Sequence, residues 1–105
     1  MAFKALFIAH APDAEFEKHN TVIDTGKYKL FTYVVRNQKE ALEVARSLHE
    51  KEQIDSILLC PGFTHADVAE LFAALDGKVA VCVSRGDGPS SKITGPVLMR
   101  EFFGK

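Results

Sequence analysis

The hydrophobic pattern of this chain alternates between short, nearly continuous apolar runs and longer segments with apolar residues at helical spacing. Apolar runs of roughly 4–8 residues between turn signals are typical of strands buried in a sheet. Four such runs predict strands at residues 3–9, 28–36, 55–60 and 78–84. The first run has the continuous apolar character expected of a strand covered on both faces. The second is rich in β-branched and aromatic residues, which favour extended backbone.

Helices are predicted in the intervals between these strands. Asn37 is a good N-cap, and an acidic residue follows it three positions later, as in a capping box. Thr64 and Asp67 stand in the same relation at the start of a second helix, which Gly77 is placed to end. A final short helix is expected to begin near Pro96, because proline suits the first turn of a helix.

Residues 11–27 carry no strong periodicity. We expect an irregular excursion there, with a turn or two of helix. The alternative is a short strand from Thr21 to Asp24 that turns at Thr25 and Gly26 into the strand 28–36.

Alternating strands and helices from residue 28 onward predict a parallel sheet with right-handed crossovers. The fold class is therefore α/β: one small domain of 105 residues with a four-stranded, mostly parallel sheet flanked by helices, flavodoxin-like or Rossmann-like. If the first strand is central and the order is 2-1-3-4, the carboxyl ends of the first and third strands are neighbours. Ligands usually bind at that edge in such folds.

Charge and composition narrow the function classes. The formal net charge is −1 and the 13 basic residues are scattered, so no basic stripe is available for nucleic acid. The apolar start of the chain is too short for a membrane span and lacks the features of a signal peptide. We expect a cytoplasmic protein without a cofactor. Its two thiols are expected to be reduced, with Cys82 acting as a small hydrophobe in a buried strand.

Chemistry-bearing residues follow three of the predicted strands. His10 ends the first strand, and Cys60, Thr64 and His65 follow the third. After the fourth comes a loop with a Gly-x-Gly pattern, hydroxyls and cations, a composition that suits an anion because glycines let backbone N–H groups approach it. The loop is neither a Walker motif nor a dinucleotide fingerprint. The alternative is a tight turn at Asp87 and Gly88 followed by a serine cap.

Cys60 is the candidate nucleophile, with His10 or His65 as its base. The alternative is a cysteine that only packs at the end of its strand. A metal site could draw on the same residues together with Asp13, but no close-spaced ligand pair defines a geometry. We therefore predict no metal.

Four runs carry a resemblance that spans the chain: Phe7–Ala14 (FIAHAPDA), Ile23–Phe31 (IDTGKYKLF), Leu59–His65 (LCPGFTH) and Arg85–Ser91 (RGDGPSS). They are similar to those of a family of short bacterial proteins of unknown function. The resemblance implies a free-standing soluble domain, bacterial in origin. It implies no activity, so no catalytic residue is carried over from it.

These observations predict a protein that binds a small anionic molecule, a phosphate or carboxylate metabolite, at the carboxyl edge of its sheet. The alternatives are a thiol-dependent enzyme and a homo-oligomeric structural or regulatory module without catalysis. We expect a homodimer, because the apolar strand 28–36 and the pair Phe102 and Phe103 require cover. The candidate ligand-binding residues are His10, Cys60, Thr64, His65, Arg85, Gly86, Asp87, Gly88, Ser90 and Ser91.

Overall fold

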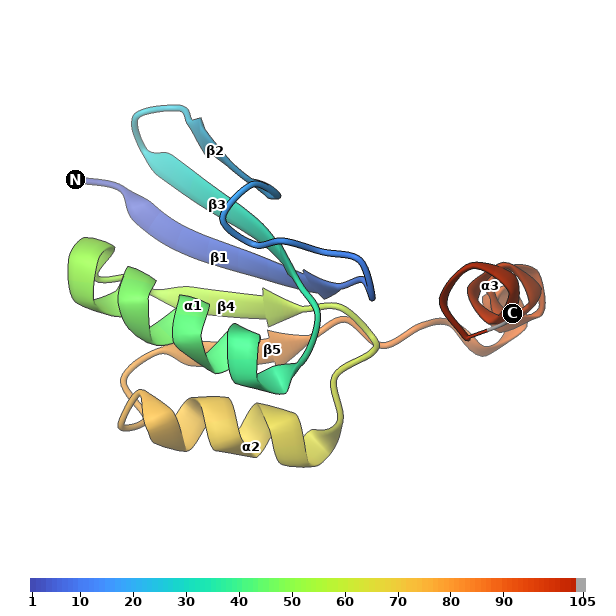
Figure 1. Cartoon of the computed structure of the whole chain (residues 1–105). Coiled ribbons are helices and arrows are strands. Elements are labelled where there is room, and N and C mark those ends of the chain that lie inside the picture. The colour runs from blue at the N-terminus through green and yellow to red at the C-terminus, as the bar shows by residue number, and fades with distance from the viewer. Residues whose placement is uncertain (104–105) are drawn as a thin grey trace.

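Five strands form a single sheet in the computed structural model, which describes residues 1–103 (Figure 1). The sheet order is β2-β3-β1-β4-β5. β1, β3, β4 and β5 are parallel, and β2 pairs antiparallel with β3. The strands are β1 (Phe3–His10), β2 (Asn20–Asp24), β3 (Tyr28–Val35), β4 (Ser56–Leu59) and β5 (Ala80–Val83).

Three α-helices accompany the sheet: α1 (Gln38–Glu52), α2 (His65–Ala74) and α3 (Ser91–Leu98). The predicted N-caps of the first two are confirmed. Asn37 accepts a hydrogen bond from the Glu40 N–H at 2.9 Å. At α2, the Asp67 N–H donates to Thr64 Oγ1 and the Thr64 N–H donates to Asp67 Oδ2, which completes a capping box.

The four predicted strands and the 2-1-3-4 order of the parallel strands are confirmed, and the fold class is α/β. The sheet has a fifth strand, however, because Thr21–Asp24 pairs with β3 instead of forming an irregular excursion. Asp24 Oδ1 accepts from the Gly26 N–H at 2.8 Å, and Gly26 takes a φ of 102° in the hairpin turn. β2 has only two apolar residues, Val22 and Ile23, and all of its residues are exposed. Its sequence therefore lacks the continuous apolar run that marks the other strands.

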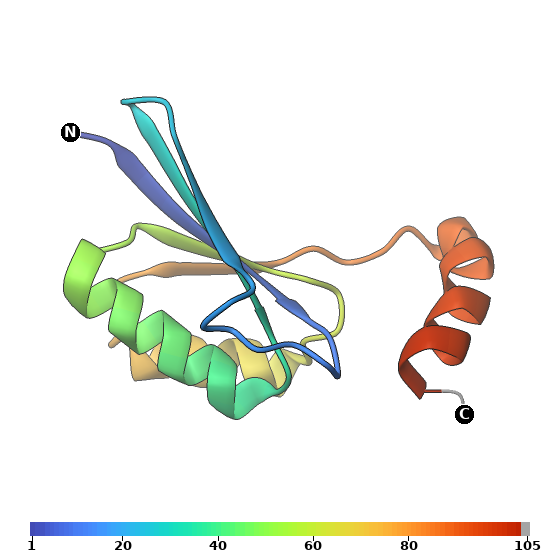
Figure 2. The same ribbon diagram turned by 45° about the horizontal axis from the view of Figure 1, so that its top comes forward.

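α1 and α2 lie on the same face of the sheet (Figures 1 and 2). The crossovers β3–α1–β4 and β4–α2–β5 advance in the same direction along the sheet, so right-handed connections put both helices on one side. This side holds the core, in which the strand residues Leu6, Ile8, Phe31, Ile57 and Leu59 are buried against the two helices.

The second face of the sheet has no helix layer in residues 1–103. Alternation along the strands puts Phe3, Leu58 and Cys82 on this face, and Phe3 and Leu58 are 48% and 44% exposed. The expectation that β1 is covered on both faces is therefore wrong, as is the expectation that Cys82 is buried. Both strands have a continuous apolar sequence, but only one of their faces has a partner layer.

The C-terminal helical segment comprises a 3₁₀ turn (Gly88–Ser90), α3 and a π-helical turn (Met99–Phe103). It begins before Pro96, contrary to our expectation, because Pro89 fills the helix-starting position and Pro96 lies inside α3. The segment stands apart from the sheet in both views (Figures 1 and 2). The radius of gyration is 14.3 Å, against about 13 Å for a compact chain of this length. None of the helices within residues 1–103 has the length and apolar character needed to cross a bilayer.

Neighbouring residues of α2 test the assignment of the core. Leu71 is fully buried, whereas Phe72 is 47% exposed. We expect Leu71→Ala to lower the free energy of unfolding by about 2–5 kcal/mol, because it leaves a cavity. Phe72→Ala should lower it by roughly 1 kcal/mol or less. Urea unfolding followed by circular dichroism measures both. Equal losses would contradict the packing of α2 described above.

Candidate functional site

The carboxyl ends of β1 and β4 bring His10 and Cys60 to the same place. β4 lies beside β1, and the Cys60 N–H donates to the Ile8 carbonyl at 3.0 Å. Gly62 then passes close to both side chains. A Cβ atom on Gly62 would lie 3.1 Å from His10 Nδ1 and 3.6 Å from Cys60 Sγ. The turn can therefore approach the imidazole this closely because residue 62 has no side chain.

The imidazole of His10 is held against the core. It stacks on Phe63, with the ring centroids 4.0 Å apart, and Phe63 is fully buried. Burial lowers the pKa of His10, and the charge of Asp67 opposes this shift. Neutral imidazole is thus the expected form at pH 7.

The two nitrogens of His10 have different surroundings. Nε2 is buried and has no hydrogen-bond partner within residues 1–103. Nδ1 is the nitrogen nearest to Gly62. A buried N–H without an acceptor is unfavourable, so the geometry favours the tautomer with its proton on Nδ1. In that form His10 presents a hydrogen-bond donor toward the turn.

The turn from Cys60 to Thr64 leads directly into α2. The Phe63 N–H donates to the Cys60 carbonyl at 3.2 Å. Thr64 uses its hydroxyl oxygen and its N–H in the capping box, so its side chain orders the helix start. His65 is the first residue of α2 and is exposed. Its N–H lies in the first turn, where backbone donors have no partner within the helix.

Arg85 returns to this turn from the end of β5. Its Nη1 donates to the carbonyls of Phe63 at 2.9 Å and Pro61 at 3.3 Å. Within residues 1–103, the Nε and Nη2 groups of Arg85 make no hydrogen bond and are available as donors. The guanidinium therefore adds a positive charge next to the positive end of the α2 dipole. Asp67 is the nearby negative charge, and its carboxylate accepts from Thr64.

The rest of the loop after β5 makes local contacts. Nothing lies within 4 Å of a Cβ built on Gly86 or Gly88. The Ser90 N–H donates to the Asp87 carbonyl, and Ser91 Oγ donates to the Gly88 carbonyl. These bonds start the C-terminal helical segment, which leads away from the sheet edge (Figure 2). The structure brings His10, Cys60, Thr64, His65 and Arg85 together, while Gly86, Asp87, Gly88, Ser90 and Ser91 are exposed along the departing chain.

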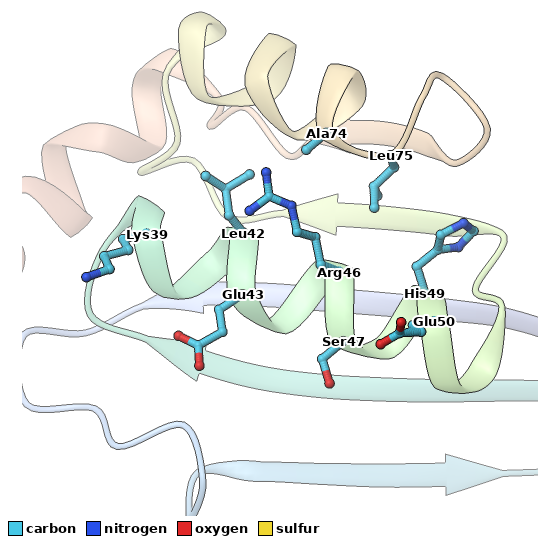
Figure 3. A pocket seen from close by; sticks show the side chains of 9 residues that line it. All are labelled: Lys39, Leu42, Glu43, Arg46, Ser47, His49, Glu50, Ala74 and Leu75. Carbon is cyan, nitrogen blue, oxygen red and sulfur yellow. The ribbon is translucent and has the colours of Figure 1, made fainter.

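Two pockets lie elsewhere on the surface. A shallow groove of about 760 Å³ runs between α1 and α2, where Lys39 and Arg46 alternate with Glu43 and Glu50 (Figure 3). A second hollow of about 300 Å³ lies between α1 and the segment that precedes β2. Neither is lined by the residues at the sheet edge. The candidate site is thus an open surface, and the part of the chain from residue 1 to 103 contains no cluster of three metal-ligating side chains.

Sequence reasoning did not assign a site role to Gly62, Phe63 or Asp67. Phe63 supports the imidazole, Gly62 allows its approach, and Asp67 acts on its pKa. A large apolar residue inside a Pro-Gly turn is the one signal that could have indicated such support. The role of Gly62 depends on His10 of β1, which lies 52 residues earlier in the chain, and no local pattern reveals it.

The fold and this edge define a class: a small α/β protein whose four parallel strands follow the order of the first four strands of a flavodoxin-like sheet. The chain belongs to a family of unknown function, DUF6506, whose family model matches residues 3–94. No curated protein and no solved structure matches the chain. The match confirms the resemblance to a family of unknown function.

The environment of His10 predicts its titration. We expect its pKa, followed by NMR, to lie below 6.5, and Asp67→Asn to lower it further, since this removes a negative charge but keeps a capping oxygen. The unfolded state then binds the proton more tightly than the folded state. The stability contributed by neutral His10 is complete above pH 6.5. It is lost as the pH falls through the unfolded-state pKa of 6.5 and then through the lower folded-state pKa. A His10 pKa above 6.5 would contradict the buried environment.

Proposed function

We propose that this protein binds a small molecule through a phosphate or carboxylate group at the edge formed by β1, β4 and the start of α2. The observation that carries the proposal is the position of Arg85. Its side chain reaches back across more than twenty residues of sequence and is held over the turn by the carbonyls of Pro61 and Phe63. A guanidinium fixed by the backbone is already oriented for a ligand, so less entropy is lost on binding.

Further donors belong to the same edge as the guanidinium. The unused N–H groups of Arg85 form a planar fork that matches the two oxygens of a carboxylate or phosphate. The first-turn N–H groups of α2, at His65 and Ala66, carry the positive end of the helix dipole. His10 adds an N–H at Nδ1 in the favoured tautomer. These groups are all donors, which suits an oxygen-rich anion.

We further propose that this binding takes place in the cytoplasm. Cys60 and Cys82 are both free thiols, and a reducing compartment keeps them so. Thr64 contributes by holding the helix start, and Cys60 contributes a weakly polar wall beside His10.

Thermal stability tests the binding proposal. With phosphate, pyrophosphate and a panel of small carboxylates as probes, at least one compound should raise the melting temperature of the wild-type protein. Ligand at 100 times its dissociation constant adds about 2.7 kcal/mol. Arg85→Gln should abolish most of that shift, because it removes the oriented charge. Arg46→Gln removes the same charge from the α1–α2 groove and should preserve the shift.

If the panel shifts nothing, the binding proposal is wrong. If Arg46→Gln removes the shift and Arg85→Gln preserves it, the anion binds in the groove between the helices and the assignment to the sheet edge is wrong.

Thiol chemistry at Cys60 is a second candidate, favoured by the common approach of Cys60 Sγ and His10 Nδ1 to Gly62. In this case the imidazole would take the thiol proton and the thiolate would attack a carbonyl carbon of a substrate, whose C=O π electrons would move to the oxygen. The surroundings of His10 weigh against it. A protonated ring would carry a second N–H at the buried Nε2, where it has no acceptor among residues 1–103. Anion binding therefore ranks first.

Alkylation by iodoacetamide separates the two candidates. In a Cys82→Ala background, which leaves Cys60 as the one thiol, the binding proposal predicts a rate at pH 7 no higher than that of a model thiol. The His10→Gln variant should react at a similar rate. The enzyme candidate predicts a rate at least about tenfold higher that falls in His10→Gln. Mass spectrometry over time measures both.

A further inference from the structure

Two apolar surfaces of this molecule have no partner in residues 1–103. The first is the sheet face opposite α1 and α2, and we call it the open face. The second is the C-terminal helical segment, residues 88–103, which packs only against itself. In both views it stands away from the sheet (Figures 1 and 2).

The open face is apolar across its width. Phe3 and Tyr28 stack on it, with ring centroids 5.7 Å apart. The register places Leu58 of the interior strand β4 and Ile23 of the edge strand β2 on the same side. Leu58 and Ile23 are 44% and 56% exposed. Such a patch on a small protein is typical of an interaction surface.

The C-terminal segment is apolar on more than one side. Ile93 is 76% exposed, and the other exposed apolar residues are Val97, Leu98, Met99, Phe102 and Phe103. A helix in water normally confines its apolar residues to one stripe, whereas a helix that is apolar all round is buried. Short isolated helices are also marginal in water. This segment therefore requires an apolar surface to pack on.

The topology explains why the open face lacks its own helix. The connection from β1 to β3 advances in the opposite direction to the later crossovers. In a doubly wound sheet a helix in that connection would cover the second face. Here the connection contains the edge strand β2 instead. One helical layer is missing, and the chain has one unpacked helical segment.

The linker decides which sheet the segment covers. The Ser84 N–H donates to the Leu59 carbonyl at 2.8 Å and continues the ladder past β5. Arg85 is then held by Pro61 and Phe63. These contacts direct the chain outward along the strand. Folding back onto its own sheet would require a reversal within Gly86 and Asp87, between the tethered Arg85 and the start of the 3₁₀ turn at Gly88, whereas docking on another copy leaves the linker unchanged.

We infer that two copies of this protein form a dimer by exchanging their C-terminal segments, each of which docks on the open face of the other copy. A helix over residues 88–103 is about 24 Å long, close to the roughly 26 Å of an eight-residue strand such as β1. Two reciprocal helix footprints about 10 Å wide remove on the order of 1,000 Å² of surface from water. This lies near the lower limit of about 1,200 Å² for stable interfaces, and contacts between the linkers add to it.

Two charge substitutions in the full chain test the exchange. Val97→Glu alters the helix, and Leu58→Glu alters the open face. Since the helix contacts no part of the sheet within one copy, Val97→Glu removes no contact from the core. Val22→Glu is the matched control, because Val22 is 48% exposed on the opposite face of the same sheet. Ile93→Glu is a second helix variant, and circular dichroism verifies that each variant is folded.

Sedimentation equilibrium should show a wild-type dimer. Val97→Glu and Leu58→Glu should each raise the dimer dissociation constant by at least about tenfold, which corresponds to about 1.4 kcal/mol, while Val22→Glu should leave it unchanged. Mixing Val97→Glu with Leu58→Glu should give more dimer than either variant alone, because the unaltered helix of Leu58→Glu docks on the unaltered face of Val97→Glu and one of the two contacts is regained.

Three results would overturn the inference. A monomeric wild-type protein would show that each helix covers its own sheet or none. A dimer insensitive to Val97→Glu would indicate pairing of the open faces without the helices. A mixture with no more dimer than the separate variants would show that the helix of one copy does not dock on the open face of the other.

Discussion

The position of β1 between β3 and β4 is the constraint on which the rest of this structure depends. Parallel pairing on both sides puts the carboxyl end of β1 beside the start of the Cys60–Thr64 turn. The same pairing aligns Leu6, Ile8, Ile57 and Leu59 on one face, where they are buried under α1 and α2. Core and candidate site are therefore products of a single register. A shift of one residue would turn these apolar side chains to the other face.

Core residues hold the side chains at this edge of the sheet in place. Phe63 belongs to the core and also forms the surface on which the His10 ring stacks. Gly62 lets the turn lie against this ring, and Arg85 joins the turn to the end of β5. The donors at this edge are positioned by backbone carbonyls, a capping box and core packing. Such preorganisation favours ligand binding even on an open surface, because few groups need to be ordered.

The single helical layer has the opposite consequence on the other side of the molecule. A sheet with helices on one face leaves half of its apolar strand residues without cover. In this protein those residues include Phe3, Tyr28 and Leu58. The C-terminal segment has the complementary need, since its apolar residues have no contact with the rest of the chain. The family match ends at residue 94, inside α3, so the sheet and the edge lie wholly within the family's shared region.

The sequence alone determined the four parallel strands and the two capped helices, because apolar runs and capping residues are local signals, and general rules of crossover handedness led to a strand order that the structure confirms. It also indicated that His10 and Cys60 would meet. Only the tertiary structure decided the roles of Gly62, Phe63 and Arg85, whose partners lie far away in the chain. It also decided that β2 forms and that Cys82 is exposed. The sequence of a continuous apolar strand is the same whether one of its faces or both are covered. Which faces are covered depends on where the helices pack.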